Sequence, residues 1–320
     1  MGRAFVLLAA VTSPRNMSGL TWHRCGLDAK WRPSFLRRRR RISYLEMSQW
    51  DDIAKDYEVR VEPVTSSFVK DMLEPLERIT DQGRAARLLD VGCGTGGATL
   101  LASEMGFSVT ATDVSPPMVN RLQERSDDGV ECAVFDGQCL PEEWTSTFDY
   151  AMSSFSVIFF RDPLQGVKEM KRVLVPSGKV VISAWGDRSD SPAFRIIPDA
   201  MKEVAPELVS GGVKKEVIST APELENLLEE AGFDSVCVKG PISRTLEIPT
   251  AEEYYNQFAL QSPPTLSMIS WMRENMGPDT VDKFREKVIS LAVERGGQQL
   301  DGPIEIVSPA YVAYGTKPSN

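Results

Sequence analysis

The stretch that decides the fold is Leu88-Leu89-Asp90-Val91-Gly92-Cys93-Gly94-Thr95-Gly96-Gly97, in which an apolar segment runs directly into a glycine-rich turn. Glycine tolerates positive φ and has no Cβ that would hold a ligand away from the backbone. Helical periodicity resumes immediately afterwards, over residues 98–102. The stretch therefore predicts a strand, a tight turn and a helix, with a ligand bound over the N-terminus of that helix.

The glycine loop alone fits two ligand classes, because Gly92, Gly94 and Gly97 also match the G-x-G-x-x-G spacing of nicotinamide and flavin sites. The next predicted strand, 108–113, ends in Asp113, and both ligand classes use such an acid to bind ribose hydroxyls. A third predicted strand, 130–135, ends in Asp136-Gly137, where a carboxylate and an amide can address the edge of an adenine ring. This third acidic strand end favours an adenosyl ligand over a dinucleotide.

With these features the sequence resembles the class I S-adenosylmethionine-dependent methyltransferases, in the small-molecule group that includes the ubiquinone and menaquinone biosynthesis methyltransferases. The resemblance covers about residues 47 to 240, and its motifs are 88–97, 109–118, 136–141, 148–149 with the strand after it, 172–182 and 223–233. Ser177 departs from the pattern, since the family usually has a second glycine after Pro176. The resemblance implies an α/β fold with a Rossmann-like, doubly wound, seven-stranded, mostly parallel sheet and helical lid insertions, and it implies S-adenosyl-L-methionine as the cofactor.

The same resemblance implies a set of cofactor-binding residues: Asp90, Gly92, Cys93, Gly94, Gly96, Asp113, Val114, Met118, Asp136, Gly137 and Ser153. Asp90 and the glycines would flank the methionine moiety, and Asp113 would bind the ribose hydroxyls. Val114 and Met118 would pack on the adenine, whose amino group would donate to Asp136. The backbone around Ser153 and Ser154 would complete the methionine side.

The resemblance also implies substrate contacts at Tyr57, Phe155 and Ser156, although Tyr57 fits a packed surface aromatic equally well. The one histidine of the sequence, His23, lies in the N-terminal leader, so no imidazole base is expected in the predicted domain. We assign no catalytic residue. An amine, thiolate or stabilised carbanion would need only positioning, and any other acceptor would need a carboxylate or Tyr57 to take its proton.

Composition narrows the function classes. Beyond residue 46 the chain carries 26 basic and 43 acidic residues, and a net charge of −17 disfavours a nucleic-acid partner. No apolar run approaches the roughly 18 to 20 residues of a transmembrane segment. The five cysteines are odd in number and form no C-x-x-C pair, which predicts neither a disulfide framework nor a zinc or other metal site, and favours a reducing, intracellular compartment. Cys93 is either a nucleophile or a small side chain that fills the glycine loop.

Residues 1–46 form a basic leader with ten Lys/Arg against two acids, and 47–320 form the predicted methyltransferase domain. The leader resembles an organellar transit segment, which would place the protein in mitochondria. A disordered tail or an over-extended gene model beginning before Met47 are the alternatives, and a cytoplasmic protein would then be expected.

Periodicity predicts further elements in the body of the chain. Helices are expected near 50–57, 64–79, 97–105, 116–125, 163–173 and 223–231, and strands near 87–91, 148–153, 179–184, 235–239 and 309–316. Two stretches outside this alternation, 186–217 and 249–302, are predicted to be lid insertions. Their aromatic and methionine side chains would either line an apolar substrate pocket or dock the insertions onto the sheet.

Three functions follow from these observations. The first is methyl transfer to a small, apolar or aromatic metabolite, with quinone precursors, sterols and other lipid-like molecules all open. The second is a non-catalytic S-adenosylmethionine-binding protein, and the third is a nicotinamide-dependent oxidoreductase, which leaves Asp136-Gly137 unexplained. The sequence does not specify the oligomeric state.

Overall fold

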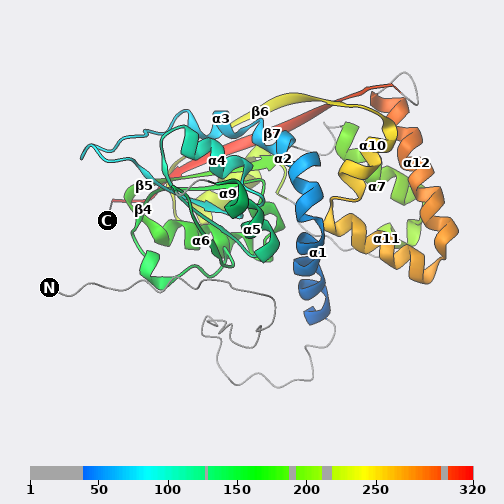
Figure 1. Cartoon of the computed structure of the whole chain (residues 1–320), viewed down its shortest axis with the longest axis horizontal. Helices are drawn as coiled ribbons and strands as arrows, with labels where there is room; N and C mark the ends of the chain where they lie inside the picture. Colours follow the sequence, from blue (N-terminus) through cyan, green and yellow to red (C-terminus); the bar gives the residue numbers. More distant parts are fainter. Residues whose placement is uncertain (1–38, 127–128, 187–191, 211–217, 297–301, 320) are drawn as a thin grey trace. The chain divides into compact units, whose positions relative to one another are not determined.

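The computed structural model describes residues 39–126, 129–186, 192–210, 218–296 and 302–319, without the side chains of 39–49, 192–194, 209–210 and 263–264. Most of the basic leader therefore lies outside the described residues. Helix α1 (Arg39–Arg60) crosses the expected boundary between residues 46 and 47 without a break (Figure 1).

One seven-stranded sheet, ordered β3-β2-β1-β4-β5-β7-β6, forms the centre of the fold, and this confirms the predicted fold class. The strands are β1 (Arg87–Val91), β2 (Ser108–Asp113), β3 (Glu131–Val134), β4 (Phe148–Ser154), β5 (Leu174–Trp185), β6 (Asp234–Ile248) and β7 (Ile304–Thr316). Strands β1 to β5 pair in parallel, whereas β7 is antiparallel to both β5 and β6. Strand order reverses at β1, so the ends of β1, β2 and β4 meet at the carboxyl edge, where ligands bind in open α/β sheets.

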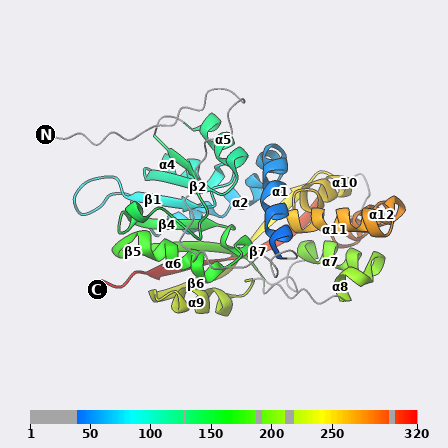
Figure 2. The same ribbon diagram turned by 90° about the horizontal axis from the view of Figure 1, so that it is seen from below.

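Helices cover both faces of the sheet (Figure 2). One face packs against α3 (Val69–Leu73), α4 (Gly97–Glu104) and α5 (Pro116–Arg125), and the other packs against α6 (Pro163–Val173) and α9 (Ala221–Glu230). Strand alternation explains the division, because Ala151 lies in the α6 and α9 core while its neighbour Met152 lies in the α3 and α4 core.

Local sequence sets the helix starts. Ser115 caps α5 just before Pro116, and Asp162 caps α6, where its Oδ1 accepts from the Gln165 amide at 3.0 Å. Helix α9 begins with a capping box between Thr220 and Glu223. These signals are local in sequence, so the bounds expected for α5 and α6 agree with the structure.

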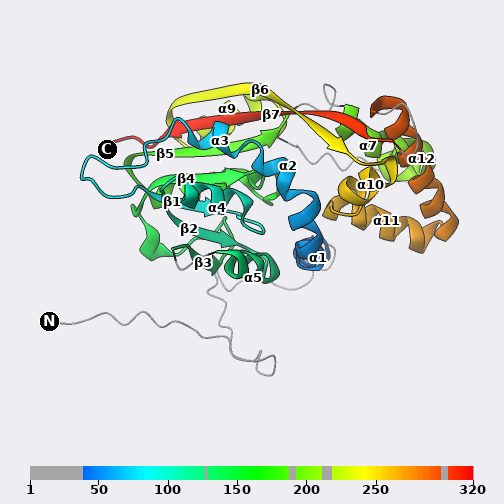
Figure 3. The ribbon, with the colours of Figure 1, turned by 45° about the horizontal axis from the view of Figure 1, so that its top comes forward.

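Strands β6 and β7 continue past the last residue of β5 as a two-stranded ribbon. Trp185, at the carboxyl end of β5, pairs with Ala310, and beyond that point β6 and β7 pair with each other as far as Ile248 and Ile304. The ribbon therefore projects beyond the carboxyl edge of the parallel strands (Figure 3). Both strands are longer than the sequence predicted for 235–239 and 309–316.

The end of the ribbon carries a set of helices with a core of their own, which we call the helical unit. Its helices are α7 (Pro192–Val204), α8 (Pro206–Ser210), α10 (Ala251–Tyr254), the π-helical η3 (Tyr255–Ala259), α11 (Pro263–Asn275) and α12 (Pro278–Gly296). Tyr254, Met272 and Phe284 are fully buried in it, together with Ile248 and Ile304 of the ribbon. These aromatic and methionine side chains thus build the interior of the helical unit.

The single helix expected over 64–79 is wrong. The structure has α2 (Glu62–Ser66) and α3 (Val69–Leu73), and the chain then turns, with Ile79 bridging to Ala85 and Gly83 at φ 76°. Pro75 explains the early end, because the residue before a proline is driven out of the helical region and proline cannot continue the hydrogen-bond ladder.

Among the described residues, no helix combines the length and apolarity that a membrane span requires.

Candidate functional site at the carboxyl edge of the sheet

The glycine loop between β1 and α4 is fixed by close packing. Gly92 and Cys93 donate their amides to the Thr112 carbonyl at 2.7 and 3.0 Å, which ties the loop to β2. A Cβ at Gly92 would lie 1.9 Å from Ser156 Oγ, and one at Gly96 would lie 2.3 Å from Leu122 Cδ1, so both positions require glycine on steric grounds.

Gly94 differs from its neighbours in the loop. A Cβ there would meet Tyr57 Cε1 at an ordinary 3.7 Å, and its φ is 55°. Glycine is therefore favoured at position 94 by its positive φ and not by lack of space, on the side of the loop that faces α1.

Asp113, at the carboxyl end of β2, is held by backbone amides. Gly94 donates to Oδ2 and Ser115 donates to Oδ1, both at 2.9 Å. Burial raises the pKa of Asp113 above its ordinary value, while the amides of Ser115, Gly94 and Val114 act in the opposite direction. Each carboxylate oxygen has a second lone pair, so the side chain can still accept from two ligand hydroxyls.

Asp90 is completely buried beneath the glycine loop. Its Oδ2 accepts from Thr99 Oγ1 at 2.6 Å, while its Oδ1 has no hydrogen-bond partner within the described part of the chain. Burial raises the pKa of Asp90 to about 7, and the nearby negative charge of Asp113 adds to the effect. A buried carboxyl with one unsatisfied oxygen fits a ligand that brings a hydrogen-bond donor or a positive charge.

Asp136 and Gly137 follow β3, and they play different structural parts. The Asp136 side chain is exposed, and its Oδ1 accepts from the Gln138 amide at 2.9 Å and from Gln138 Nε2 at 3.0 Å. Gly137 is buried, and a Cβ there would lie 2.6 Å from Val91 Cγ1. Gly137 therefore lets the chain pack closely against β1, while Asp136 presents its carboxylate at the strand tip.

Helix α1 covers the start of α5. Ser115 Oγ bonds Asp51 Oδ1 at 2.5 Å, and Met118, 2% exposed, packs against Ile53 and Ala54. Trp50 and Tyr57 surround this cluster, with their ring centroids 6.0 Å apart. The structure thus places Met118 and Tyr57, from the predicted set, on the same side of the glycine loop.

Tyr57 and Cys93 are unsuited to act as ionised groups. Burial raises the pKa of the Tyr57 hydroxyl, and the negative charges of Glu62 and Asp113 raise it further. Burial also raises the pKa of the Cys93 thiol well above its ordinary value, and the side chain is 7% exposed. A thiol that stays protonated is a poor nucleophile, so Cys93 serves as a small side chain in the loop.

The chain after β4 adjoins the glycine loop. Ser153 is buried and donates to the Val91 carbonyl at 2.9 Å, and the Ser156 hydroxyl occupies the space beside Gly92. Between them, Phe155 adopts a left-handed conformation with φ 54°, which is strained for an aromatic residue, and its amide donates to Ser183 Oγ at 3.0 Å.

Phe155 belongs to an aromatic wall formed with Phe68 and Trp185. Its ring stacks on Trp185 with the centroids 4.0 Å apart, and Phe68 meets both rings edge-on at 5.4 and 5.9 Å. Sequence reasoning missed Phe68, which lies between two short helices and carries no motif. Phe68 and Phe155 are 0% and 3% exposed, so the wall is part of the core, and it adjoins the glycine loop through Ser156.

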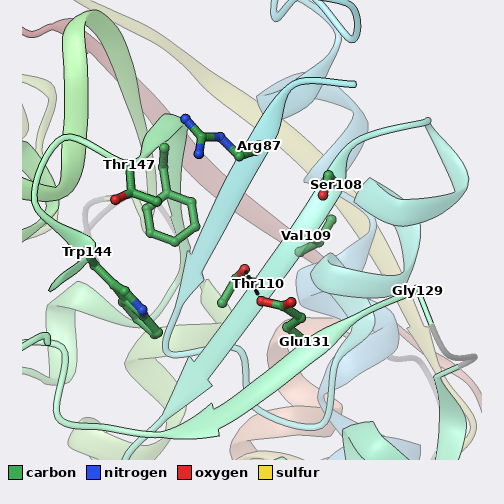
Figure 4. Close-up of a pocket in the computed structure, with 9 residues that line it drawn as sticks. Arg87, Ser108, Val109, Thr110, Gly129, Glu131, Trp144 and Thr147 are labelled. Atoms are coloured by element: carbon green, nitrogen blue, oxygen red, sulfur yellow. Dashed lines mark hydrogen bonds between the residues drawn. The ribbon is translucent and has the colours of Figure 1, made fainter. Parts of the chain in front are cut away.

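A pocket lies at the amino ends of the parallel strands, opposite the carboxyl edge that carries the candidate site (Figure 4). Its lining includes the first residues of four strands, Arg87, Ser108, Glu131 and Phe148. Parallel strands keep their amino and carboxyl ends apart, and none of the predicted site residues lines this pocket. Within the described ranges, no group of three or more His, Cys, Asp or Glu side chains could hold a metal ion.

Part of the chain matches a known protein family. Residues 89–182 match the family described as "Methyltransferase domain", a range that runs from β1 to β5 and contains the glycine loop, Asp113, Asp136 and Phe155. Helices α1 and α2 and the helical unit lie outside the match.

Two curated relatives and one solved structure illustrate the similarity. The chain is 26% identical over 228 residues to 2-methyl-6-phytyl-1,4-hydroquinone methyltransferase from Synechocystis sp., covering 59% of this chain and 71% of that protein. It is 34% identical over 163 residues to demethylmenaquinone methyltransferase from Clavibacter sepedonicus, covering 47% and 66%. A putative methyltransferase from Bacillus halodurans aligns in structure with a TM-score of 0.49 at 16% identity, covering 79% of this chain and 99% of that one.

Proposed function

This chain is a class I S-adenosylmethionine-dependent methyltransferase, and from that premise we propose that it methylates a small apolar or aromatic metabolite, with its cofactor held at the carboxyl edge of β1, β2 and β3. The observation that carries the proposal is the half-satisfied, buried Asp90 beneath the glycine loop, close enough to Asp113 for their charges to interact. S-adenosyl-L-methionine has an ammonium for the first carboxylate and two ribose hydroxyls for the second.

The residues of the edge fit that cofactor. In this proposal, Asp90 Oδ1 accepts from the α-ammonium group, and Asp113 uses its remaining lone pairs for the ribose hydroxyls. Asp136, exposed just past β3, accepts from the adenine amino group, and Val114 and Met118 contact the ring. When bound, the cofactor supplies an activated methyl group on a sulfonium centre.

The aromatic wall of Phe68, Phe155 and Trp185 supports a flat, apolar acceptor. It adjoins the loop through Ser156. Because Phe68 and Phe155 are buried, an acceptor would pack against the partly exposed Trp185. Holding two reactants in line is worth about 7 to 11 kcal/mol. Positioning and the exclusion of water are therefore what the chain contributes to the reaction.

The available proton acceptors restrict the class of acceptor. The described residues contain no histidine, and burial keeps the pKa of Tyr57 above its ordinary value, so Tyr57 stays protonated at neutral pH. We therefore favour an acceptor that supplies its own nucleophile. A hydroquinone is one such acceptor, because ionisation of its own hydroxyl activates the ring, and two similar proteins are named for hydroquinone or demethylmenaquinone methylation.

The test of this function has a binding arm and a transfer arm. Calorimetry on the full chain should show binding of S-adenosylhomocysteine and none of NAD, and Asp113→Ala should weaken that binding at least about tenfold because it removes charge-assisted hydrogen bonds. Asp81→Ala, at an exposed turn residue, is the matched control and should bind as the wild type does. Preferred binding of NAD would contradict the proposal.

In the transfer arm, the protein is incubated with methyl-labelled cofactor and a small-molecule extract. Label should appear in an apolar or aromatic product, and it should disappear with Asp113→Ala. Binding without any labelled product would instead favour the non-catalytic S-adenosylmethionine-binding alternative.

A further inference from the structure

We propose that Glu62, at the start of α2, holds the glycine loop in shape through Arg125 and Thr95. The segment before β1 would then contribute to the cofactor site. The inference rests on the proposed function, because it concerns how that same site is kept in shape. Glu62 lies outside the range 89–182 that matches the methyltransferase domain.

Glu62 is bound on both of its carboxylate oxygens. Arg125 Nη2 donates to Oε1 at 2.7 Å and Arg125 Nη1 donates to Oε2 at 2.7 Å, which is the two-point geometry that fits a guanidinium to a carboxylate. Thr95 Oγ1 also donates to Oε2, at 2.5 Å. Glu62 is 8% exposed and Thr95 is 1% exposed, so these two residues are shielded from water, while the Arg125 side chain is 26% exposed.

Thr95 is held at its backbone as well as at its side chain. Arg125 Nη1 donates to the Thr95 carbonyl at 2.8 Å, so the pair of Glu62 and Arg125 binds both the carbonyl and the hydroxyl of that residue. Thr95 lies between Gly94 and Gly96, whose φ angles are 55° and 105°. Fixing Thr95 therefore fixes the two peptides that present the loop to a ligand.

Glycines lose more conformational freedom on ordering than other residues, so a loop with several of them needs external contacts to keep one shape. Asp113 supplies one contact at the front, where it accepts from the Gly94 amide. The Glu62 cluster supplies a second contact next to Gly97, where a Cβ would lie only 2.4 Å from Glu62 Cγ. Helix α2 thus lies directly against the loop.

A second ion pair offers a matched comparison. Arg121 Nε donates to Glu58 Oε2 at 2.8 Å, and Glu58 Oε1 also lies 3.6 Å from Arg125 Nε, so Glu58 joins α1 to α5, the helix that carries both arginines. None of the contacts described for Glu58 reaches a residue of the glycine loop. Both pairs therefore fasten the N-terminal segment to α5, but Glu62 alone also bonds the loop.

The experiment compares Glu62→Gln with Glu58→Gln in the full chain, with S-adenosylhomocysteine as the calorimetric probe and thermal unfolding as the second readout. Glu62→Gln should raise the dissociation constant about tenfold or more, because it removes the charge that holds Arg125 and Thr95. Glu58→Gln should change it less than about threefold, since it weakens partly buried ion pairs that join α1 to α5 but removes no bond to the loop. Equal losses of affinity in the two variants would overturn the inference, because they would mean that only docking of the N-terminal segment matters.

Thr95→Val guards against a folding defect in Glu62→Gln. It keeps the shape of the side chain and removes the hydroxyl that donates to Glu62, so a loss of roughly threefold to tenfold in affinity is expected. Normal binding by both Glu62→Gln and Thr95→Val, with a wild type that binds the probe, would overturn the inference alone. A wild type that does not bind the probe would overturn the proposed function as well.

Discussion

The glycine-loop edge of the sheet and the helical unit on the ribbon are built on opposite principles. Around the loop, Asp90 and Ser154 keep buried oxygens without partners among the described residues, and Phe155 is held in a strained backbone conformation. The helical unit instead buries large apolar side chains such as Tyr254, Met272 and Phe284 against one another, with Gln261 Oε1 as its unpartnered buried polar atom in the described part of the chain. Unpartnered buried oxygens and backbone strain cost stability, and the proposed polar ligand would account for them at the edge, whereas the helical unit is shaped by packing.

Helix α1 touches both regions. Asp51 and Glu58 bond α5 beside the glycine loop, while Arg60 pairs with Glu253 of α10 and its carbonyl accepts from Gln257. Leu266 of α11 joins the cluster around Met118. The two regions are therefore joined through α1, and substitutions can show how far they behave independently.

The largest effect should come from the core of the helical unit. Phe284 is fully buried and meets the Tyr255 ring edge-on, with centroids 6.3 Å apart. Phe284→Ala should destabilise the protein by about 3 to 5 kcal/mol, because it removes apolar contacts and leaves a cavity. Denaturant unfolding measures that loss, and calorimetry should show S-adenosylhomocysteine affinity within about threefold of the wild type. If affinity instead fell in proportion to the loss of unfolding free energy, the two regions would be energetically coupled.

Asp90→Asn, unlike Phe284→Ala, should weaken ligand binding without destabilising the fold. The folded pKa of Asp90, about 7, lies above the ordinary carboxyl value of 3.8, so the native state holds a proton that the unfolded chain releases between these pH values. The wild-type contribution of this group to stability therefore falls as pH rises from about 4 to about 7. The amide cannot ionise, so Asp90→Asn should be more stable than the wild type at about pH 8, by roughly 1 kcal/mol or more, and the advantage should vanish at about pH 4.

The same substitution should weaken S-adenosylhomocysteine binding at about pH 8 by roughly tenfold, since a neutral amide replaces the charge that would face the ammonium. Wild-type affinity should also fall between about pH 8 and about pH 6 as Asp90 takes up its proton, while the variant stays flat. Calorimetry at the two pH values tests both statements. A wild type whose affinity does not change with pH would show that Asp90 does not meet the ammonium.

Sequence predicted the edge far better than the helical unit, for physical reasons. The bounds of β1, β2, α5 and α6 follow from signals within a few residues, such as the glycine turn and the Ser115 and Asp162 caps. Contacts between distant residues left no such signal. Glu62 meets Thr95 across 33 positions and Arg125 across 63, and nothing in the local sequence of any of the three indicates the others.

The length of the ribbon escaped prediction for a similar reason. Past the pairing of Trp185 with Ala310, β6 and β7 pair only with each other. Ile304 and Ile306 alternate there because they pack into the core of the helical unit, which the local sequence does not reveal. The roles of the predicted cofactor residues stay predictions. The structure brings Asp90, Asp113 and the glycines together, and it gives Gly137 a packing role that the resemblance did not suggest.

Phe155 allows a smaller effect to be measured at the edge itself. Its φ of 54° favours glycine over any residue with a Cβ, so Phe155→Gly should be more stable than Phe155→Ala by about 1 kcal/mol, even though alanine fills more space. Both variants should lose the stacking on Trp185, and both should bind S-adenosylhomocysteine nearly as the wild type does while transferring less methyl to the acceptor. Denaturant unfolding of the two variants gives the difference, and an alanine variant of equal or greater stability would contradict the strain.

The smallest effect is expected on the outer surface of the helical unit, where two neighbours in α11 form a matched pair. Trp271 is 39% exposed and Met272 is fully buried, although they are adjacent in the chain. Trp271→Ser should change the free energy of unfolding by no more than about 0.5 kcal/mol, because it leaves the interior intact. Met272→Ser should cost several times as much, since it both opens a cavity and buries a hydroxyl. If the Trp271 variant proved as unstable as the Met272 variant, the exposed ring would have to be covered in the folded protein, and the helical unit would then present a contact surface rather than a solvated face.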